Sequence, residues 1–231
     1  MKNFPLQYFK SMSPKNKKIL TYSALTVVVL ALLLLVWCLV GRWNEQRTLD
    51  RYLANPETKQ FAEWIIRDKN ELAGDLEKVK QIAPTMDIGL QWYNLHEYGY
   101  AVNWWGKGLD IEPKNTIGWY NLGNAHMELG NYWRAERAYR RSIEHAKKGD
   151  IEGCLGLGEL YQYKYKEKAS EEPKVYLNCL KKSPKDPDLL SRLALYYKGI
   201  GDKENALKYF DELYTVYPTI DIGEELRALR M

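Results

Sequence analysis

The sequence contains few cysteines and histidines, two residue types that hold metal ions and take part in nucleophilic catalysis. Its 231 residues include only three cysteines and three histidines. The histidines, His96, His126 and His145, are widely spaced, and the sequence has no CxxC motif, HExxH motif or Cys/His cluster with metal-ligand spacing. Ser-His-Asp order, paired carboxylates and a nucleotide loop do not stand out either. We therefore predict that the protein is not an enzyme and uses no catalytic residue, metal, cofactor or small-molecule substrate.

An excess of basic residues is missing from nearly the whole chain. The formal net charge is +4. Residues 1–18 hold five lysines and no acidic residue, so residues 19–231 carry the difference between +4 and +5, a net charge of −1. A nucleic-acid-binding domain needs a concentrated basic face. The composition therefore argues against nucleic acid as a partner, and the basic stub is expected to set topology and to contact anionic headgroups.

Charged residues are also absent from residues 19–40, an almost wholly apolar run. A helix of this length spans roughly 33 Å, enough to cross a hydrocarbon core of about 30 Å. A cleaved signal peptide has an apolar region of only about 7–15 residues, and a core helix of a soluble protein would show a polar stripe. We therefore predict one uncleaved transmembrane anchor over residues 19–40.

The lysines before this run set its expected orientation. Loops on the cytoplasmic side of a membrane carry the excess of lysine and arginine. This favours a cytoplasmic N-terminus, with residues 42–231 outside the cytoplasm. In a bacterium that is the periplasmic side of the inner membrane.

The region after residue 81 repeats the same residue types at a step near 34 residues. From Thr116 the recurring positions are Trp119, Leu122, Gly123, His126, Gly130, Tyr132, Ala135 and Tyr139. From Pro187 they are Leu190, Leu193, Ala194, Tyr197, Gly201, Ala206, Phe210, Leu213 and Pro218. A degenerate copy from Ile82 has Ile88, Gly89, Trp92, Tyr98, Ala101, Trp105, Gly108 and Pro113. A copy over Ile151–Asp186 slips in frame at Lys166–Glu172, where we expect an enlarged turn.

This pattern resembles the tetratricopeptide repeat (TPR), W-x2-L-G-x2-Y followed by G-x-Y-x2-A-x3-F/Y and a later proline. The resemblance implies an all-α fold in which helix hairpins stack into a right-handed superhelix. The small residues let the two helices of a hairpin approach closely, and the aromatic residues fill the gaps. The four predicted repeats are 82–115, 116–149, 150–186 and 187–220.

Two flanking segments complete the predicted organisation. Residues 41–81 are expected to continue the membrane helix outward and then to form a degenerate capping helix pair. The second helix of that pair would carry the apolar stripe Leu72, Leu76, Val79 and Ala83. Residues 221–231 are expected to form a C-terminal capping helix over the last repeat, because a solenoid needs its end faces covered.

The resemblance also implies a groove lined by the first helix of each repeat. Asparagines in such a groove can pair with the main chain of an extended peptide, and tyrosines give rigid contact area. The predicted groove residues are Tyr93, Asn94, Tyr120, Asn121, Asn124, Met127, Glu128, Glu159, Gln162, Tyr163, Arg192 and Lys198. The alternative is an inner face that is only solvated, or that is filled by the C-terminal helix.

A second hypothesis places docking on large aromatic side chains outside the repeat signature. Large aromatics exposed beyond the needs of packing mark interfaces. The predicted docking aromatics are Trp104, Trp133, Tyr196 and Tyr214.

The cysteines leave one question open. Cys38 falls in the predicted anchor, whereas Cys154 and Cys179 fall on helices expected to pack together. Oxidation is possible outside the cytoplasm, so a disulfide is one expectation. Two isolated buried thiols are the other, and the prediction favours them.

These features favour a membrane-anchored protein–protein interaction scaffold, an accessory or assembly subunit of a membrane protein complex. Its partners would be integral membrane proteins, because an anchor confines the search to the membrane plane and raises the effective concentration there. The alternative is a chaperone-like adaptor for exported or assembling polypeptides, the architecture of membrane-anchored TPR proteins of secretion and cytochrome maturation.

Overall fold

The computed structural model describes residues 14–231, and within them every regular element is helical. The predicted all-α fold is therefore confirmed. The α-helices are α2 (Pro14–Leu53), α3 (Lys59–Leu72), α4 (Ile82–Asn94), α5 (Tyr98–Ile111), α6 (Thr116–Glu128), α7 (Tyr132–His145), α8 (Glu152–Glu159), α9 (Glu172–Leu180), α10 (Pro187–Gly199), α11 (Lys203–Val216) and α12 (Ile220–Arg230). Two short 3₁₀-helices, which are more tightly wound than an α-helix, also occur: η1 (Lys78–Gln81) and η3 (Lys166–Glu171). A wider π-helical turn, η2 (Leu160–Lys164), follows α8.

The chain divides into two units, one that ends at Lys59 and one that runs from Gln60 to Met231. In the first unit, α2 continues without a break through the predicted anchor and beyond it. Its stretch Leu25–Leu53 is long and apolar enough to cross a membrane, and its most apolar window is not buried. The helix ends before Asn55, whose side-chain carbonyl accepts a hydrogen bond of 3.1 Å from the backbone N–H of Glu57.

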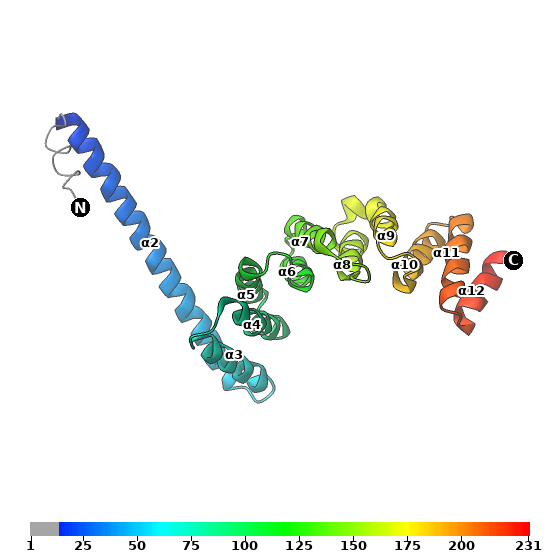
Figure 1. Ribbon diagram of the computed structural model, residues 1–231, viewed down its shortest axis with the longest axis horizontal. Helices are drawn as coiled ribbons and strands as arrows, with labels where there is room; N and C mark the ends of the chain where they lie inside the picture. The colour runs from blue at the N-terminus through cyan, green and yellow to red at the C-terminus, as the bar shows by residue number, and fades with distance from the viewer. Residues whose placement is uncertain (1–13) are drawn as a thin grey trace. The chain divides into compact units, whose positions relative to one another are not determined.

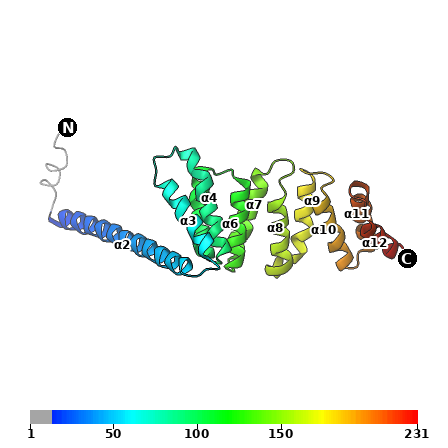
Figure 2. The same ribbon diagram turned by 90° about the horizontal axis from the view of Figure 1, so that it is seen from below.

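In the second unit, the helices from α4 to α11 form four successive hairpins. Each first helix packs on its second helix, α4 on α5, α6 on α7, α8 on α9 and α10 on α11. Successive hairpins also touch, since α5 contacts α6, α7 contacts α8, and α9 contacts α10. Figures 1 and 2 show α4 to α12 side by side in chain order. The predicted solenoid and its C-terminal capping helix, α12 on α11, are confirmed.

Close contact between a glycine and a ring explains the small residues of the repeat signature. A Cβ atom at Gly89 would lie 2.5 Å from the Trp105 ring, and one at Gly123 would lie 2.5 Å from the Tyr139 ring. At Gly158 it would lie 2.0 Å from the Tyr176 hydroxyl oxygen. No real Cβ tolerates such distances, so each glycine lets an aromatic ring of the second helix lie directly on the backbone of the first. In the last hairpin Ala194 and Phe210 are both buried.

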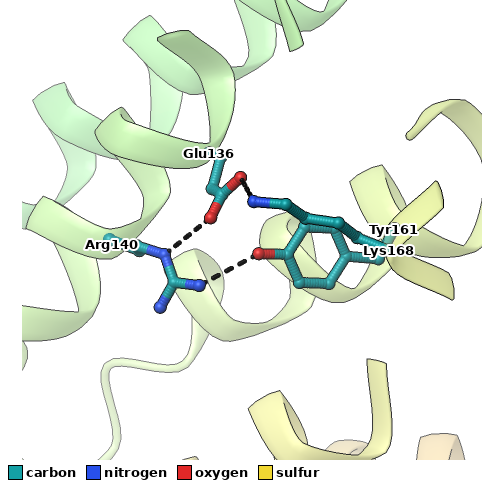
Figure 3. Close-up of polar contacts among 4 residues, drawn as sticks. All are labelled: Glu136, Arg140, Tyr161 and Lys168. Carbon is teal, nitrogen blue, oxygen red and sulfur yellow. Dashed lines mark hydrogen bonds and ion pairs between the residues drawn. The ribbon is translucent and has the colours of Figure 1, made fainter. Parts of the chain in front are cut away.

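The frame slip in the third repeat is an enlarged turn built from η2 and η3. Figure 3 shows how this turn is fixed to α7. Glu136 of α7 accepts hydrogen bonds from Lys168 Nζ at 2.5 Å and from Arg140 Nε at 2.9 Å, and Arg140 Nη2 donates to the Tyr161 hydroxyl at 3.1 Å. Burial opposes ionisation of Glu136, but these charged donors hold its pKa below the ordinary value. The turn is therefore tied to the preceding repeat by a charged residue that stays ionised.

The predicted second helix of the capping pair, from Leu72 to Ala83, is wrong. α3 ends at Leu72, and only the short η1 precedes α4. Gly74 and Asp75 lie one residue beyond the end of α3, and both residue types are poor helix formers. Val79, expected on the buried stripe, is 68% exposed.

The prediction that favoured two isolated thiols is also wrong. Cys154 in α8 and Cys179 in α9 form a disulfide, with Cα atoms 6.3 Å apart. This distance lies within the range that a disulfide spans without backbone movement. The bond joins the two helices of the third hairpin across the enlarged turn.

Candidate functional site

We name the predicted groove residues of α4, α6, α8, η2 and α10 the first-helix face. These helices come from successive hairpins, and α6 contacts α8 directly. The face is therefore continuous from the second repeat to the third. Some of its side chains already form hydrogen bonds, ion pairs or ring contacts with other residues of the protein, whereas others do not.

Tyr93 of α4 is half-buried where the first repeat meets the second. Its ring centroid lies 5.2 Å from that of Tyr98 and 5.6 Å from that of Trp105. Burial, and next the negative charge of Glu128 in α6, raise the pKa of Tyr93 to about 12. Rings at these separations attract each other. Tyr93 is thus a fixed, protonated phenol with Glu128 close by, and Tyr98 is a neighbour that the sequence prediction missed.

Asn124 of α6 is tied to the core by Tyr139 of α7. The Tyr139 hydroxyl donates a hydrogen bond of 2.6 Å to Asn124 Oδ1, and the Tyr120 ring lies 6.0 Å from the Tyr139 ring. Met127 also contacts this hydroxyl through its sulfur, at 3.9 Å. The carbonyl of Asn124 is therefore engaged, which leaves its amide N–H₂ group as the end that can meet a partner.

Asn94 and Asn121 differ from Asn124. Asn94 is exposed and Asn121 is half-buried. Within residues 14–231 no hydrogen bond engages either side chain. Their amide groups can both donate to and accept from the main chain of an extended peptide.

Four charged residues of the C-terminal half are engaged in pairs. Arg192 Nη2 of α10 lies 2.6 Å from Glu159 Oε1 of α8. Lys198 Nζ of α10 lies 2.6 Å from Glu225 Oε2 of the capping helix. The predicted Arg192 and Glu159 are thus brought together, whereas Lys198 is directed to α12. The contact of Lys198 with α12 agrees with the alternative that the C-terminal helix fills the inner face at the C-terminal end of the solenoid.

The third repeat holds two polar side chains that are at least half-buried and one tyrosine that is exposed. Gln162 is half-buried in η2, and its Oε1 has no hydrogen-bond partner among the described residues, while Tyr163 is 57% exposed. Glu172, which the sequence prediction missed, is only 4% exposed at the start of α9. Burial raises the pKa of Glu172 to about 7, although the charges of Arg192 and Lys166 oppose the rise. The only sequence signal for it was an acid next to Pro173 after an enlarged turn.

The predicted docking aromatics separate into two groups. Trp104 is only 9% exposed, and Lys107 Nζ lies 3.7 Å from the centre of its ring. Its prediction as an exposed docking residue is wrong, because α5 turns it toward the interior. Trp133 is 58% exposed and Tyr214 is 43% exposed. Tyr196 is half-buried, with its ring edge-on to a neighbour.

These surfaces carry groups suited to non-covalent contact. They offer amide groups, phenols and paired charges, which bind main chain and side chains of other polypeptides. In the described part of the chain, no group of three or more His, Cys, Asp or Glu is placed to hold a metal ion.

Comparison with known proteins agrees with this geometry. Models of the tetratricopeptide repeat match residues 117–148 and 187–220. A TPR repeat-containing protein of Borreliella burgdorferi is 29% identical over 137 residues, which cover 54% of this chain. The chain thereby spans only 58% of that relative's own length.

Solved structures of MamA share the fold. One crystal structure superposes with a TM-score of 0.52 at 18% identity, over 70% of this chain and 87% of that one. A second gives a TM-score of 0.51 at 18% identity, over 75% of this chain and 97% of the other. At this identity the likeness concerns the fold alone. The repeat signatures, the stacked hairpins and the matching family models together show a tetratricopeptide-repeat solenoid, a fold that supports protein–protein interaction.

Proposed function

We propose that this TPR protein is a membrane-anchored scaffold, an accessory or assembly subunit of a membrane protein complex. Its solenoid would stand outside the cytoplasm, on the periplasmic side in a bacterium. The observation that carries the proposal is the joining, in one chain, of an apolar helix long enough to span a membrane and a repeat solenoid with unengaged amide and aromatic groups on its first helices.

The apolar helix supports the membrane part of the proposal. Leu25–Leu53 lies near the N-terminus, where a signal sequence would also lie. The apolar run of residues 19–40 exceeds the usual length of a signal-peptide core, about 7–15 residues. An uncleaved anchor confines the solenoid to the membrane plane. This raises its effective concentration toward other membrane proteins without any new contact.

The disulfide supports the proposed side of the membrane. Cys154 and Cys179 are both only 3% exposed, and they are bonded to each other. Disulfides persist in the periplasm and outside cells, and they are rare in the cytosol. This agrees with the lysine-rich N-terminal stub, which favours a cytoplasmic N-terminus.

The first-helix face supports contact with other polypeptides. Asn94 and Asn121 offer free amide groups, and the exposed Tyr163 offers an aromatic ring with a polar tip. Such groups bind an extended segment by its main chain and hold it by rigid contact area. A stable subunit would keep one such segment in place, whereas a chaperone-like adaptor would hold many in turn.

Site-specific photocrosslinking separates these two functions. A photoreactive amino acid would replace Asn94 or Tyr163 on the first-helix face. As a matched control it would replace Glu212, an exposed residue of α11. The proposal predicts that both face positions crosslink to the same one or two integral membrane proteins, and that Glu212 does not.

Crosslinks from both face positions to many different unfolded or newly exported chains would instead establish the chaperone-like adaptor. Equal crosslinking at all three positions, or at none, would remove the first-helix face as the contact surface.

A further inference from the structure

A cavity of about 630 Å³ opens between the second helices α5 and α7, with α6 as its floor. It lies away from the first-helix face, because Trp119, Leu122 and His126 lie on the side of α6 opposite to its first-helix-face residues. The residues that decide its chemistry are Trp119, His126, Trp133, Arg134, Arg137 and Arg141. No acidic residue is among those that line it.

The cationic side chains of this cavity are only partly neutralised. Arg141 Nη1 lies 2.8 Å from Glu144 Oε2. Arg134 and Arg137 are exposed, and neither forms an ion pair with a carboxylate within residues 14–231. They are three residues apart on α7 and so share one side of that helix, about 4.5 Å apart along its axis. Two unpaired guanidinium groups therefore flank one cavity in a domain whose net charge is close to zero.

The floor of the cavity adds an unsatisfied polar atom. His126 is 8% exposed, and its Nδ1 is buried without a hydrogen-bond partner in the described structure. Burial, and then the charge of Arg134, hold the pKa of His126 below its ordinary value. A buried ring nitrogen without a partner is costly.

Two tryptophans form walls for an apolar or planar group. The Trp119 Nε1–H donates a hydrogen bond of 2.8 Å to the carbonyl of Pro113, which fixes this ring. The Trp133 ring is 58% exposed, and the Arg134 guanidinium carbon lies 5.0 Å from its centre. Arginine and tryptophan are enriched among the few residues that contribute most of the binding energy of a protein interface.

We propose that this cavity binds an acidic segment of a protein partner. The carboxylates of this segment would pair with Arg134 and Arg137, and the aliphatic parts of its acidic side chains would pack on Trp133. Arginine recognises carboxylates with two parallel hydrogen bonds. A nucleic acid would need a longer basic surface than two free arginines provide. The inference rests on the proposed scaffold function, since it names the chemistry of a partner and a second surface for it.

Direct peptide binding tests the cavity without the membrane complex. The full chain would be held in nanodiscs of phosphatidylcholine, and a fluorescent hexaglutamate peptide would be titrated at low and raised salt. Hexaglutamine is the neutral comparison peptide. We expect hexaglutamate alone to bind, and more weakly as salt screens the charges.

Matched variants then locate the binding. The double substitution Arg134→Gln and Arg137→Gln is expected to weaken hexaglutamate binding by about tenfold or more, since each exposed ion pair contributes up to about fivefold. The control, Lys203→Gln with Arg227→Gln, removes the same charge from α11 and α12 and should leave the affinity within about twofold. Circular dichroism should be the same for both, because all four side chains are exposed.

The proposal is overturned if hexaglutamate binds no better than hexaglutamine, or if both double variants weaken binding equally. It is also overturned if added phosphatidylserine vesicles bind through Arg134 and Arg137 while the peptide does not, since the site would then face lipid. None of these results concerns crosslinking from Asn94 or Tyr163. Failure here is therefore distinct from failure of the proposed function.

Discussion

The hydroxyl of Tyr139 donates a hydrogen bond of 2.6 Å to the side-chain carbonyl of Asn124, and this bond links the core of the solenoid to its first-helix face. Tyr139 is fully buried, and its ring lies against the backbone at both Gly123 and Gly156. One side chain thus joins the second repeat to the third and orients an amide at the surface.

A double-mutant cycle measures this bond. Tyr139→Phe removes the hydroxyl and should lower the free energy of unfolding by about 1 kcal/mol. Asn124→Ala leaves a buried hydroxyl without its acceptor and should cost about 1–3 kcal/mol. Urea unfolding of the full chain in phosphatidylcholine nanodiscs, followed by circular dichroism, gives both values. If the two losses simply add in the double variant, the two groups are not coupled and the bond contributes nothing.

Glycine-to-alanine substitutions test the contact between ring and backbone. Gly158→Ala would place a methyl group 2.0 Å from the Tyr176 hydroxyl oxygen. We expect it to destabilise the fold by about 2–3 kcal/mol, the cost of overpacking a filled core. Gly106→Ala is the control: it lies in α5 with nothing within 4 Å of the added atom, and should stabilise the helix by about 1 kcal/mol. Equal effects at the two positions would show that Tyr176 does not lie on Gly158.

The disulfide should be formed in the cell and should stabilise the third repeat. In chain extracted without reductant, Cys154 and Cys179 should resist alkylation, and Cys38 should be the one cysteine that reacts after unfolding. Replacing Cys154 and Cys179 together with serine should lower the free energy of unfolding by about 2–4 kcal/mol. Mass spectrometry of the alkylated chain gives the first result. Two further alkylated thiols would contradict both the bond and the proposed compartment.

Glu172 should make stability depend on pH. Its pKa is raised from 4.5 to about 7 in the folded state. The folded state then binds the proton more tightly, so the contribution of Glu172 to stability is fully present below about pH 4.5 and is lost as pH rises through about 7, by about 3 kcal/mol in total. Glu172→Gln should abolish this fall, whereas Glu167→Gln, an exposed acid of the same turn, should keep it. Urea midpoints at acidic and neutral pH decide between them. A wild type that grows more stable over this interval would contradict the assignment.

The repeat architecture could be predicted because glycine, alanine and aromatic residues recur at the spacing that stacked hairpins require. The same signal is missing between Leu72 and Ala83, where an apolar stripe suggested a helix and the pair Gly74-Asp75 prevented it. The stripe describes only periodicity, and it contains no information on whether a neighbour is present to bury it. This is why the second helix of the capping pair was mispredicted.

Side-chain engagement could not be predicted in the same way. Trp104 and Trp133 are both tryptophans of second helices, but α5 buries the first and α7 exposes the second. The disulfide could not be predicted because it requires a short distance between α8 and α9, and the spacing of the cysteines along the chain does not determine that distance. The sequence did not reveal the cavity of Arg134 and Arg137. A net charge near zero conceals a local group of arginines when the acidic residues of the domain pair with other side chains.

Extraction of the full chain from native membranes in a mild detergent, followed by size separation and quantitative mass spectrometry, tests whether the protein is a subunit of one membrane protein complex. We expect the 27.1 kDa chain to migrate with one defined set of membrane proteins at a fixed molar ratio, and the ratio to be the same across independent preparations. A free chain, or a broad distribution with many substoichiometric polypeptides, would contradict it.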